Sequence, residues 1–274
     1  MIYLIAFILF ITGLFVGSFL NVVIDRIPRK ETIVKGRSYC EFCKKELKWY
    51  DLIPLLSFIF LKGKCRYCHT KLSFFYPAIE ISTGILFLLT YFFAIFNFQF
   101  LISNEYFNAL IFNPKSLISL AYYLFIVSSF IIIFFEDLKY GVIPDKIVFP
   151  AITVSLVYLF FFNQQSLIIN LFSGLVAFLF FLVLYLATKG KGMGFGDVKL
   201  VLLLGFILGF PGILLALYMA FLTGAFVGLI LIIWKKKSSI KDTISFGPFL
   251  IGTSLISLFW GGQLYSFALM LLGI

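Results

Sequence analysis

Eight long apolar runs, separated by short polar segments, constrain this chain more than any other feature. A helix that crosses about 30 Å of hydrocarbon needs roughly 20 apolar residues. With 62% of its residues hydrophobic and only 12% charged, the chain could not hide its apolar surface inside one water-soluble core. We therefore expect an all-α polytopic membrane protein with about eight transmembrane helices. The runs cover residues 1–24, 77–98, 117–135, 147–162, 167–187, 198–210, 212–234 and 246–273.

The sixth run, 198–210, is short for a transmembrane helix. Two interpretations account for it. The helix begins earlier, near Gly194, or residues 198–234 form one broken element that bends at Pro211-Gly212.

The basic residues fix the expected orientation. If the N-terminus lies outside, the segments that face inside are 25–76, 136–146, 188–199 and 235–245, and they hold 12, 2, 3 and 4 Lys and Arg residues. Together these are 21 of the 22 in the chain, as the positive-inside rule requires. Both termini are then outside, and the formal charge of +10 reflects membrane topology rather than a nucleic-acid surface.

The positions of the polar segments predict that the chain has two regions. Residues 1–98 contain the first span, the large polar segment 25–76 and the second span. The polar connection 99–116 then predicts a boundary, and residues 117–274 form a core of six spans.

All four cysteines lie in segment 25–76, as two C-x-x-C pairs separated by 21 residues. Two such pairs at this spacing are typical of a small zinc-ribbon-like loop domain, and a closed four-thiolate site is structural rather than catalytic. Two disulfides are the alternative, which a reducing cytoplasm disfavours. His69 either replaces one ligand or is a surface residue. The predicted ligands are Cys40, Cys43, Cys65 and Cys68.

Two aspartates at the edges of apolar runs indicate a catalytic site. Asp137 follows an apolar run with only Glu136 between them, and Asp197 follows three closely spaced glycines, including Gly194 and Gly196. The predicted topology places both on the cytoplasmic side, and carboxylates at a membrane boundary are costly and usually functional. The structural alternatives are an ion pair of Asp137 with Lys139, and stabilisation of Asp197 by a helix N-terminus.

If the two carboxyl groups meet in a poorly hydrated site, they are expected to share one proton. One then acts as general base on a water molecule, while the other polarises the scissile carbonyl and protonates the leaving amine. This is the chemistry of an aspartic protease.

Several segments in register resemble the prepilin peptidases, also called type IV leader peptidases, of the GxGD aspartic protease group. They are GSFLNVVIDRIP (17–28), the double cysteine knuckle with KWYDLIPLLSFIFLKGKC (48–65), SFFYPAIEISTGILF (73–87), DLKYGVIPD (137–145) and GMGFGDVK (192–199). The chain departs from the family at Asp25-Arg26, where His-Arg is common, and at Cys40-Glu-Phe-Cys43, where C-P-x-C is common.

The resemblance implies a bacterial plasma (inner) membrane protein, with its active site at the cytoplasmic face. The enzyme would remove the short basic leader from type IV prepilins or pseudopilins, and methylate the new N-terminus with S-adenosylmethionine. By resemblance Asp137 and Asp197 are catalytic, and Asp145 and Lys199 support them.

The methyl-donor site cannot be read from a known nucleotide-binding motif. The candidates are polar residues where the loop meets the membrane: Asn21, Arg26, Asp51 and Glu80. For Asn21 the alternative is an interhelical hydrogen bond, and for Arg26 an anchor to lipid headgroups.

A basic loop that receives a basic leader poses an electrostatic problem. Acidic groups such as Glu41, Glu46 and Asp51, or anionic lipids, are expected to offset the repulsion.

Two other functional classes compete with a peptidase. A non-catalytic zinc-containing scaffold for pilus or secretion assembly would keep Asp137 and Asp197 as structural residues. A proton-coupled transporter is disfavoured, because the acids cluster at one face and not near the midplane.

Overall fold

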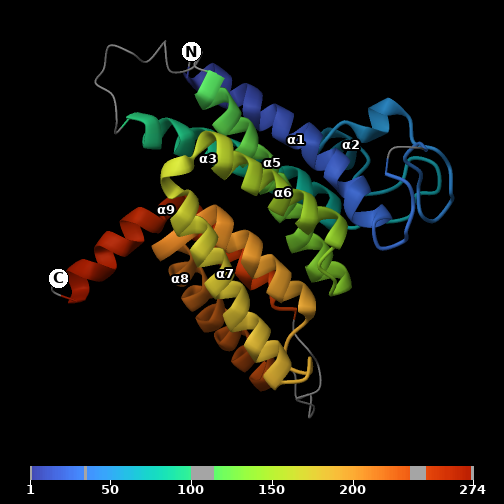
Figure 1. The fold of residues 1–274 in the computed structure, drawn as a ribbon. Coiled ribbons are helices and arrows are strands. Elements are labelled where there is room, and N and C mark those ends of the chain that lie inside the picture. Colours follow the sequence, from blue (N-terminus) through green and yellow to red (C-terminus); the bar gives the residue numbers. More distant parts are fainter. Residues whose placement is uncertain (1, 34–35, 100–113, 235–244, 273–274) are drawn as a thin grey trace. The chain divides into compact units, whose positions relative to one another are not determined.

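The computed structural model describes residues 2–33, 36–99, 114–234 and 245–272. Within these ranges the chain is helical and contains no strand beyond two isolated β-bridges (Figure 1). The expected all-α architecture is confirmed. The elements are α1 (Ile2–Arg26), the 3₁₀ helix η1 (Trp49–Leu52), α2 (Leu56–Phe60), α3 (Phe75–Gln99), α5 (Pro114–Tyr140), α6 (Asp145–Phe162), α7 (Gln164–Ala187), α8 (Phe195–Trp234) and α9 (Gly247–Leu272).

Six of these helices, α1, α3, α5, α6, α7 and α8, are long and apolar enough to cross a membrane. The 40-residue α8 comprises two helices joined at a break, and α9 adds a further 26 residues. Counting the two parts of α8 separately, the described residues hold eight helical segments in these helices and α9, while six helices qualify as spans; the expected number of about eight spans stays a prediction. The predicted connection 99–116 and the basic loop 235–245 fall almost wholly outside the described residues.

The break in α8 explains the short sixth run. Gly209 has φ 60° and ψ −172°, and Phe210 is extended at φ −89° and ψ 139°. The break precedes the predicted Pro211-Gly212, because a residue before proline is pushed out of helical conformation, whereas the proline itself can begin the next helix. Both interpretations describe part of the structure, because α8 begins at Phe195, next to Gly194, and is also broken at Gly209 and Phe210.

Polar side chains bond to backbone carbonyls on both sides of this break inside the apolar core. Asn170 on α7 donates from Nδ2 to the carbonyl oxygen of Phe206 at 2.9 Å, and Ser257 on α9 donates to that of Gly212 at 2.8 Å. Since lipid offers no hydrogen bonds, a broken helix survives in a membrane only with partners of this kind.

The chain divides into two compact units, Met1–Ile132 and Ile133–Ile274, and the division falls within α5. In the first unit α1 packs against α3, and in the second α8 packs against α7 and α9. The α1–α3 contact depends on glycines. A Cβ on Gly13 would lie 2.8 Å from the Cα of Gly84, and one on Gly17 would lie 2.7 Å from the Cα of Glu80. Small residues permit this close approach, as in other membrane helix pairs.

Candidate active site and metal centre

Asp137 lies in the last turn of α5, within the second unit. Its backbone carbonyl accepts hydrogen bonds from the N–H of Gly141 at 2.9 Å and from the hydroxyl of Ser245 at 3.1 Å. Ser245 lies just ahead of α9, so the end of α5 is tied to the start of that helix. The side chain of Asp137 is 5% exposed, and its Oδ2 has no partner of good hydrogen-bond geometry among the described residues.

Asp197 lies in the first turn of α8, where its N–H donates to the carbonyl of Gly194 at 3.2 Å. The residue is 7% exposed. Its carboxyl group lies within electrostatic range of the Asp137 carboxyl. The structure thus brings together the two aspartates that the sequence singled out, from elements sixty positions apart, in one buried place.

Glycines shape the surroundings of this pair. A Cβ on Gly196 would lie 2.9 Å from the Cβ of Ile143, and one on Gly247 would lie 2.5 Å from Oδ2 of Asp137 and 3.4 Å from Cδ1 of Ile143. The start of α8, the start of α9 and the loop that follows α5 therefore converge closely around the Asp137 carboxyl. By contrast, a Cβ on Gly194 would meet Oδ2 of Asp197 at an ordinary 3.5 Å.

This difference between the two glycines of the GFGD segment gives a matched pair of variants. Gly196→Ala should displace the loop at Ile143 and lower leader cleavage by about tenfold or more, since small misplacements near reacting groups are costly. Gly194→Ala should stay within a few-fold of the wild type. Rates measured on a purified prepilin, with thermal unfolding as a folding control, test this. Equal losses in both variants would show that close packing at 196 is not the cause.

Asp145 and Lys199 form an ion pair that joins the start of α6 to the first turns of α8. The Lys199 ammonium also lies over the rings of Phe149 and Phe195, at 5.5 and 5.3 Å from their centroids. The pair couples the two segments that carry the predicted catalytic motifs. The pair therefore links the start of α6 to the start of α8.

The sequence does not identify Ser245 and Gly247 as neighbours of Asp137. The only local signal was Gly247-Pro248 ahead of the last apolar run, since proline is common in the first turn of a helix. That signal predicts a helix start, but it does not show that the glycine faces Asp137.

The four cysteines converge in the first unit. Their Sγ atoms all lie within 4.8 Å of one another, and those of Cys40 and Cys68 are 3.8 Å apart. Four thiolates at about 2.3 Å from a central zinc ion would be separated by roughly 3.8 Å along each edge of the tetrahedron. The cluster can therefore hold a metal ion, and its donor set and spacing suit zinc.

The two cysteine pairs have the same backbone design. The carbonyl of Cys40 accepts from the N–H of Lys44 at 2.8 Å, and that of Cys65 accepts from the N–H of His69 at 3.0 Å. Lys44 and His69 both have φ 56°, so each turn closes with a left-handed residue. His69 is exposed and does not belong to the sulfur cluster; it occupies a turn position, as the surface interpretation expected.

Side chains around the second pair hold it to the preceding segment. Asp51, whose side chain is 3% exposed, accepts from Arg66 Nε at 2.6 Å, from the Tyr67 hydroxyl at 3.1 Å and from the Lys48 N–H at 3.1 Å. Burial, together with the bond to Asp51, raises the pKa of Tyr67 to about 12. The hydrogen bond with Thr70 lowers the pKa of the Cys68 thiol to about 6, which favours the thiolate.

The other methyl-donor candidates lie in the first unit and also have internal contacts. Asn21 donates from Nδ2 to the carbonyl of Tyr76 at 3.2 Å, as the alternative of an interhelical bond expected, but its buried Oδ1 has no partner among the described residues. Glu80 accepts from the N–H of Leu55 at 2.8 Å. Arg26 is buried and donates to the carbonyls of Thr32, Gly36 and Arg37, so it organises its own loop.

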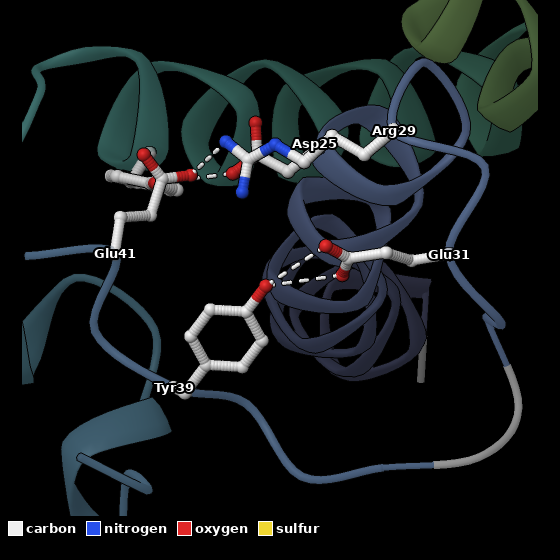
Figure 2. Close-up of polar contacts among 6 residues, drawn as sticks. Asp25, Arg29, Glu31, Tyr39 and Glu41 are labelled. Carbon is white, nitrogen blue, oxygen red and sulfur yellow. Dashed lines mark hydrogen bonds and ion pairs between the residues drawn. The ribbon is translucent and has the colours of Figure 1, made fainter. Parts of the chain in front are cut away.

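Figure 2 shows the acidic groups near the end of α1. Glu41 forms an ion pair with Arg29, while Glu31 accepts from the Tyr39 hydroxyl through both oxygens, at 3.0 and 3.1 Å. Glu46 pairs with Arg37 at 3.5 Å. The three acidic groups that were expected to offset a basic leader, Glu41, Glu46 and Asp51, are therefore each paired with an arginine of the same domain.

These features define a multi-pass membrane protein with a buried aspartate pair at helix ends and a separate four-cysteine cluster. Residues 11–94 match the model of the bacterial peptidase A24 N-terminal domain, and residues 124–229 match that of the type IV leader peptidase family. The chain belongs to the type IV leader peptidase family, which confirms the resemblance drawn from its motifs.

Curated relatives named prepilin leader peptidase/N-methyltransferase align along nearly the whole chain. The one from Bacillus subtilis is 33% identical over 260 residues, which cover 95% of this chain and 96% of the relative. The one from Legionella pneumophila is 31% identical over 293 residues, which cover 94% and 93%. No solved structure gives a significant match to this chain.

Proposed function

We propose that this protein is a membrane-embedded aspartic endopeptidase that removes the basic leader from type IV prepilins or pseudopilins and then N-methylates the new N-terminus. The observation that carries the peptidase activity is the burial of Asp137 and Asp197 within electrostatic range of each other. The family and the names of the relatives support both activities.

In the proposed mechanism the two carboxyl groups hold one proton between them. The ionised one takes a proton from a water molecule, whose oxygen attacks the scissile carbonyl carbon, while the protonated one donates a hydrogen bond to the carbonyl oxygen. Collapse of the tetrahedral intermediate breaks the C–N bond, and the amine leaves with a proton from a carboxyl group. No covalent intermediate with the enzyme is formed.

The substrate reaches this site as a membrane helix. The scissile bond must be extended before attack, because a helical peptide ties up its carbonyls in intrahelical hydrogen bonds. Since Glu41, Glu46 and Asp51 are paired with arginines, we assign the attraction of the basic leader chiefly to anionic lipids.

For methylation we assign S-adenosylmethionine to the first unit, the region that matches the A24 N-terminal domain. The orphaned Oδ1 of Asn21 supports a ligand there, because a buried acceptor without a partner is costly. We retain Asn21 as a contact of the donor. Arg26, Asp51 and Glu80 would act through the loop that they hold. The donor supplies the methyl group, and the protein must hold the new amine neutral and in line with it.

We assign the four-cysteine cluster to a structural zinc ion held by Cys40, Cys43, Cys65 and Cys68. Cys65→Ser should reduce zinc content from about one ion per chain to nearly none and open the loop domain to proteolysis, since structural zinc contributes about 10–16 kcal/mol to folding in small zinc domains. Elemental analysis and limited proteolysis measure both effects. His69→Asn is the matched control and should keep its zinc; loss of zinc from this variant would make His69 a ligand.

The distribution of Lys and Arg along the sequence supports a plasma (inner) membrane topology with both termini outside and the active site at the cytoplasmic face. The direct test of the function is incubation of the purified protein, in lipid, with a type IV prepilin and S-adenosylmethionine. Mass spectrometry should detect loss of the leader and then one added methyl group. An unprocessed prepilin would favour the scaffold, whereas processing without methylation would remove only the second activity.

A further inference from the structure

The segment between the two cysteine pairs exposes large apolar side chains. Ile59 is 67% exposed and Phe60 80%, and Trp49 and Leu56 are also exposed. The charge pattern of the sequence assigns this segment to a water-facing loop. Each fully hydrated side chain of this size forfeits about 1.5–3 kcal/mol that burial would recover, and a contiguous apolar patch marks an interaction surface.

Two hydrogen bonds fix the level of this segment along the spans. The Ser18 hydroxyl donates to the carbonyl of Leu52 at 3.4 Å, and the Leu55 N–H donates to Oε2 of Glu80 at 2.8 Å. Ser18 lies eight residues before the end of α1 at Arg26, and Glu80 lies five residues after the start of α3 at Phe75. At 1.5 Å per residue these positions are about 12 and 8 Å inside the helix ends.

The segment therefore runs beside the two membrane helices and not beyond their ends. Exposed Phe15 and Phe19 flank Ser18 on α1, so the neighbouring helix surface at this level is itself apolar.

The backbone of the segment meets the requirement for a position inside a bilayer. Leu55 has φ 59°, an unusual conformation for leucine, and its N–H is satisfied by the buried Glu80 carboxyl group. Pro54 has no N–H to satisfy. The N–H groups of Ser57 and Ile59 bond to the carbonyls of Ile53 and Leu55 at 3.1 and 2.9 Å. Irregular backbone is tolerated at membrane depth only when its polar groups have such partners.

The flanks of the segment match a membrane interface. Lys48 and Trp49 precede it, and Lys62 and Lys64 follow it. Tryptophan favours the headgroup region, and lysine can extend its ammonium group to anionic headgroups while its stem stays in apolar surroundings.

We propose that residues 52–61 form a re-entrant segment, which buries Leu56, Ile59 and Phe60 among the acyl chains of the leaflet on the side of the cysteine cluster. The occupant of this apolar face is lipid, because α1 and α3 carry the segment to the depth of the membrane that they cross. The segment anchors the cysteine cluster at the membrane surface.

The test uses the full chain in nanodiscs, with tryptophan fluorescence as the probe. The three native tryptophans, Trp49, Trp234 and Trp260, are replaced by Phe, and Phe60→Trp provides the reporter. Phe42→Trp is the matched control, since Phe42 is also an exposed phenylalanine of the same domain but lies within the first cysteine pair. Ile59→Trp is a second reporter in case the first variant does not fold.

Lipids with bromine atoms on their acyl chains should lower the emission of Phe60→Trp by about twofold or more, as expected for a side chain buried below the headgroups, and should leave Phe42→Trp nearly unchanged. Aqueous iodide should quench the emission of Phe42→Trp more strongly than that of Phe60→Trp. Equal iodide quenching of both reporters would overturn the proposal. So would a blue-shifted reporter that brominated lipid does not quench, because protein would then cover the segment.

Discussion

Replacing either Asp137 or Asp197 by Asn is expected to lower the rate of leader cleavage by about a thousandfold or more, while membrane insertion remains normal. Asn has nearly the shape of Asp but can neither take a proton from water nor give one to the leaving amine. Both residues are buried in the second unit and interact with each other. Each substitution therefore removes one of the two carboxyl groups that transfer protons during cleavage. Cleavage of a prepilin by purified protein in lipid, followed by mass spectrometry, measures the effect.

The control for this prediction removes a carboxylate elsewhere. Glu31→Gln takes away an acid of the first unit that bonds to the Tyr39 hydroxyl, and it should leave the cleavage rate within about twofold, as expected for a substitution outside the acid–base pair. If both Asn variants cleave at wild-type rates, Asp137 and Asp197 are structural residues and the scaffold function regains support.

The second large effect is expected at Gly247, which no motif in the sequence marks. A Cβ at this position would lie 3.1 Å from Cγ of Asp137, which is a tight contact, and 2.5 Å from Oδ2, which is closer than real Cβ atoms approach other groups. Gly247→Ala should therefore displace the Asp137 carboxyl group and lower cleavage by about a hundredfold, because a displacement of 1 Å can cost this much. The first unit does not contain the site, so methylation of a leader-free pilin should be retained.

A second glycine of the same helix provides the comparison. A Cβ on Gly252 would meet nothing within 4 Å beyond its own turn of helix. Gly252→Ala should therefore leave cleavage unchanged and stabilise α9 by up to about 1 kcal/mol. A Gly247→Ala variant as active as Gly252→Ala would show that the carboxyl group does not need its present position.

The sequence predicted the features that depend on composition and local spacing. Apolar run length predicted the spans, the C-x-x-C pairs predicted the sulfur cluster, and Asp137 and Asp197 stood out because acids at membrane boundaries are rare. Each of these signals lies within a short stretch of chain, so it can be recognised without knowing which distant residues contact it.

The features that the sequence did not reveal depend on contacts between distant segments. The approach of Gly247 to Asp137 and the bond from Leu55 to Glu80 join residues far apart in the chain, and neither follows a helical period. The apolar stretch 52–61 is too short to be a span and lies among lysines, so the sequence alone predicts that it belongs to the polar loop. As one of two alternatives the sequence predicts a bend at Pro211-Gly212, but steric restriction acts on the residue before the proline, and the break lies at Gly209 and Phe210.

In the proposed mechanism Asp137 and Asp197 act as one unit on one water molecule. The most direct measurement compares the cleavage rates of the wild type, the Asp137→Asn and Asp197→Asn variants, and the doubly substituted protein. Groups that act together lose nearly everything with the first substitution, so the double variant should be about as slow as either single one. Losses that multiply in the double variant, or a double variant that still cleaves its prepilin, would contradict the account.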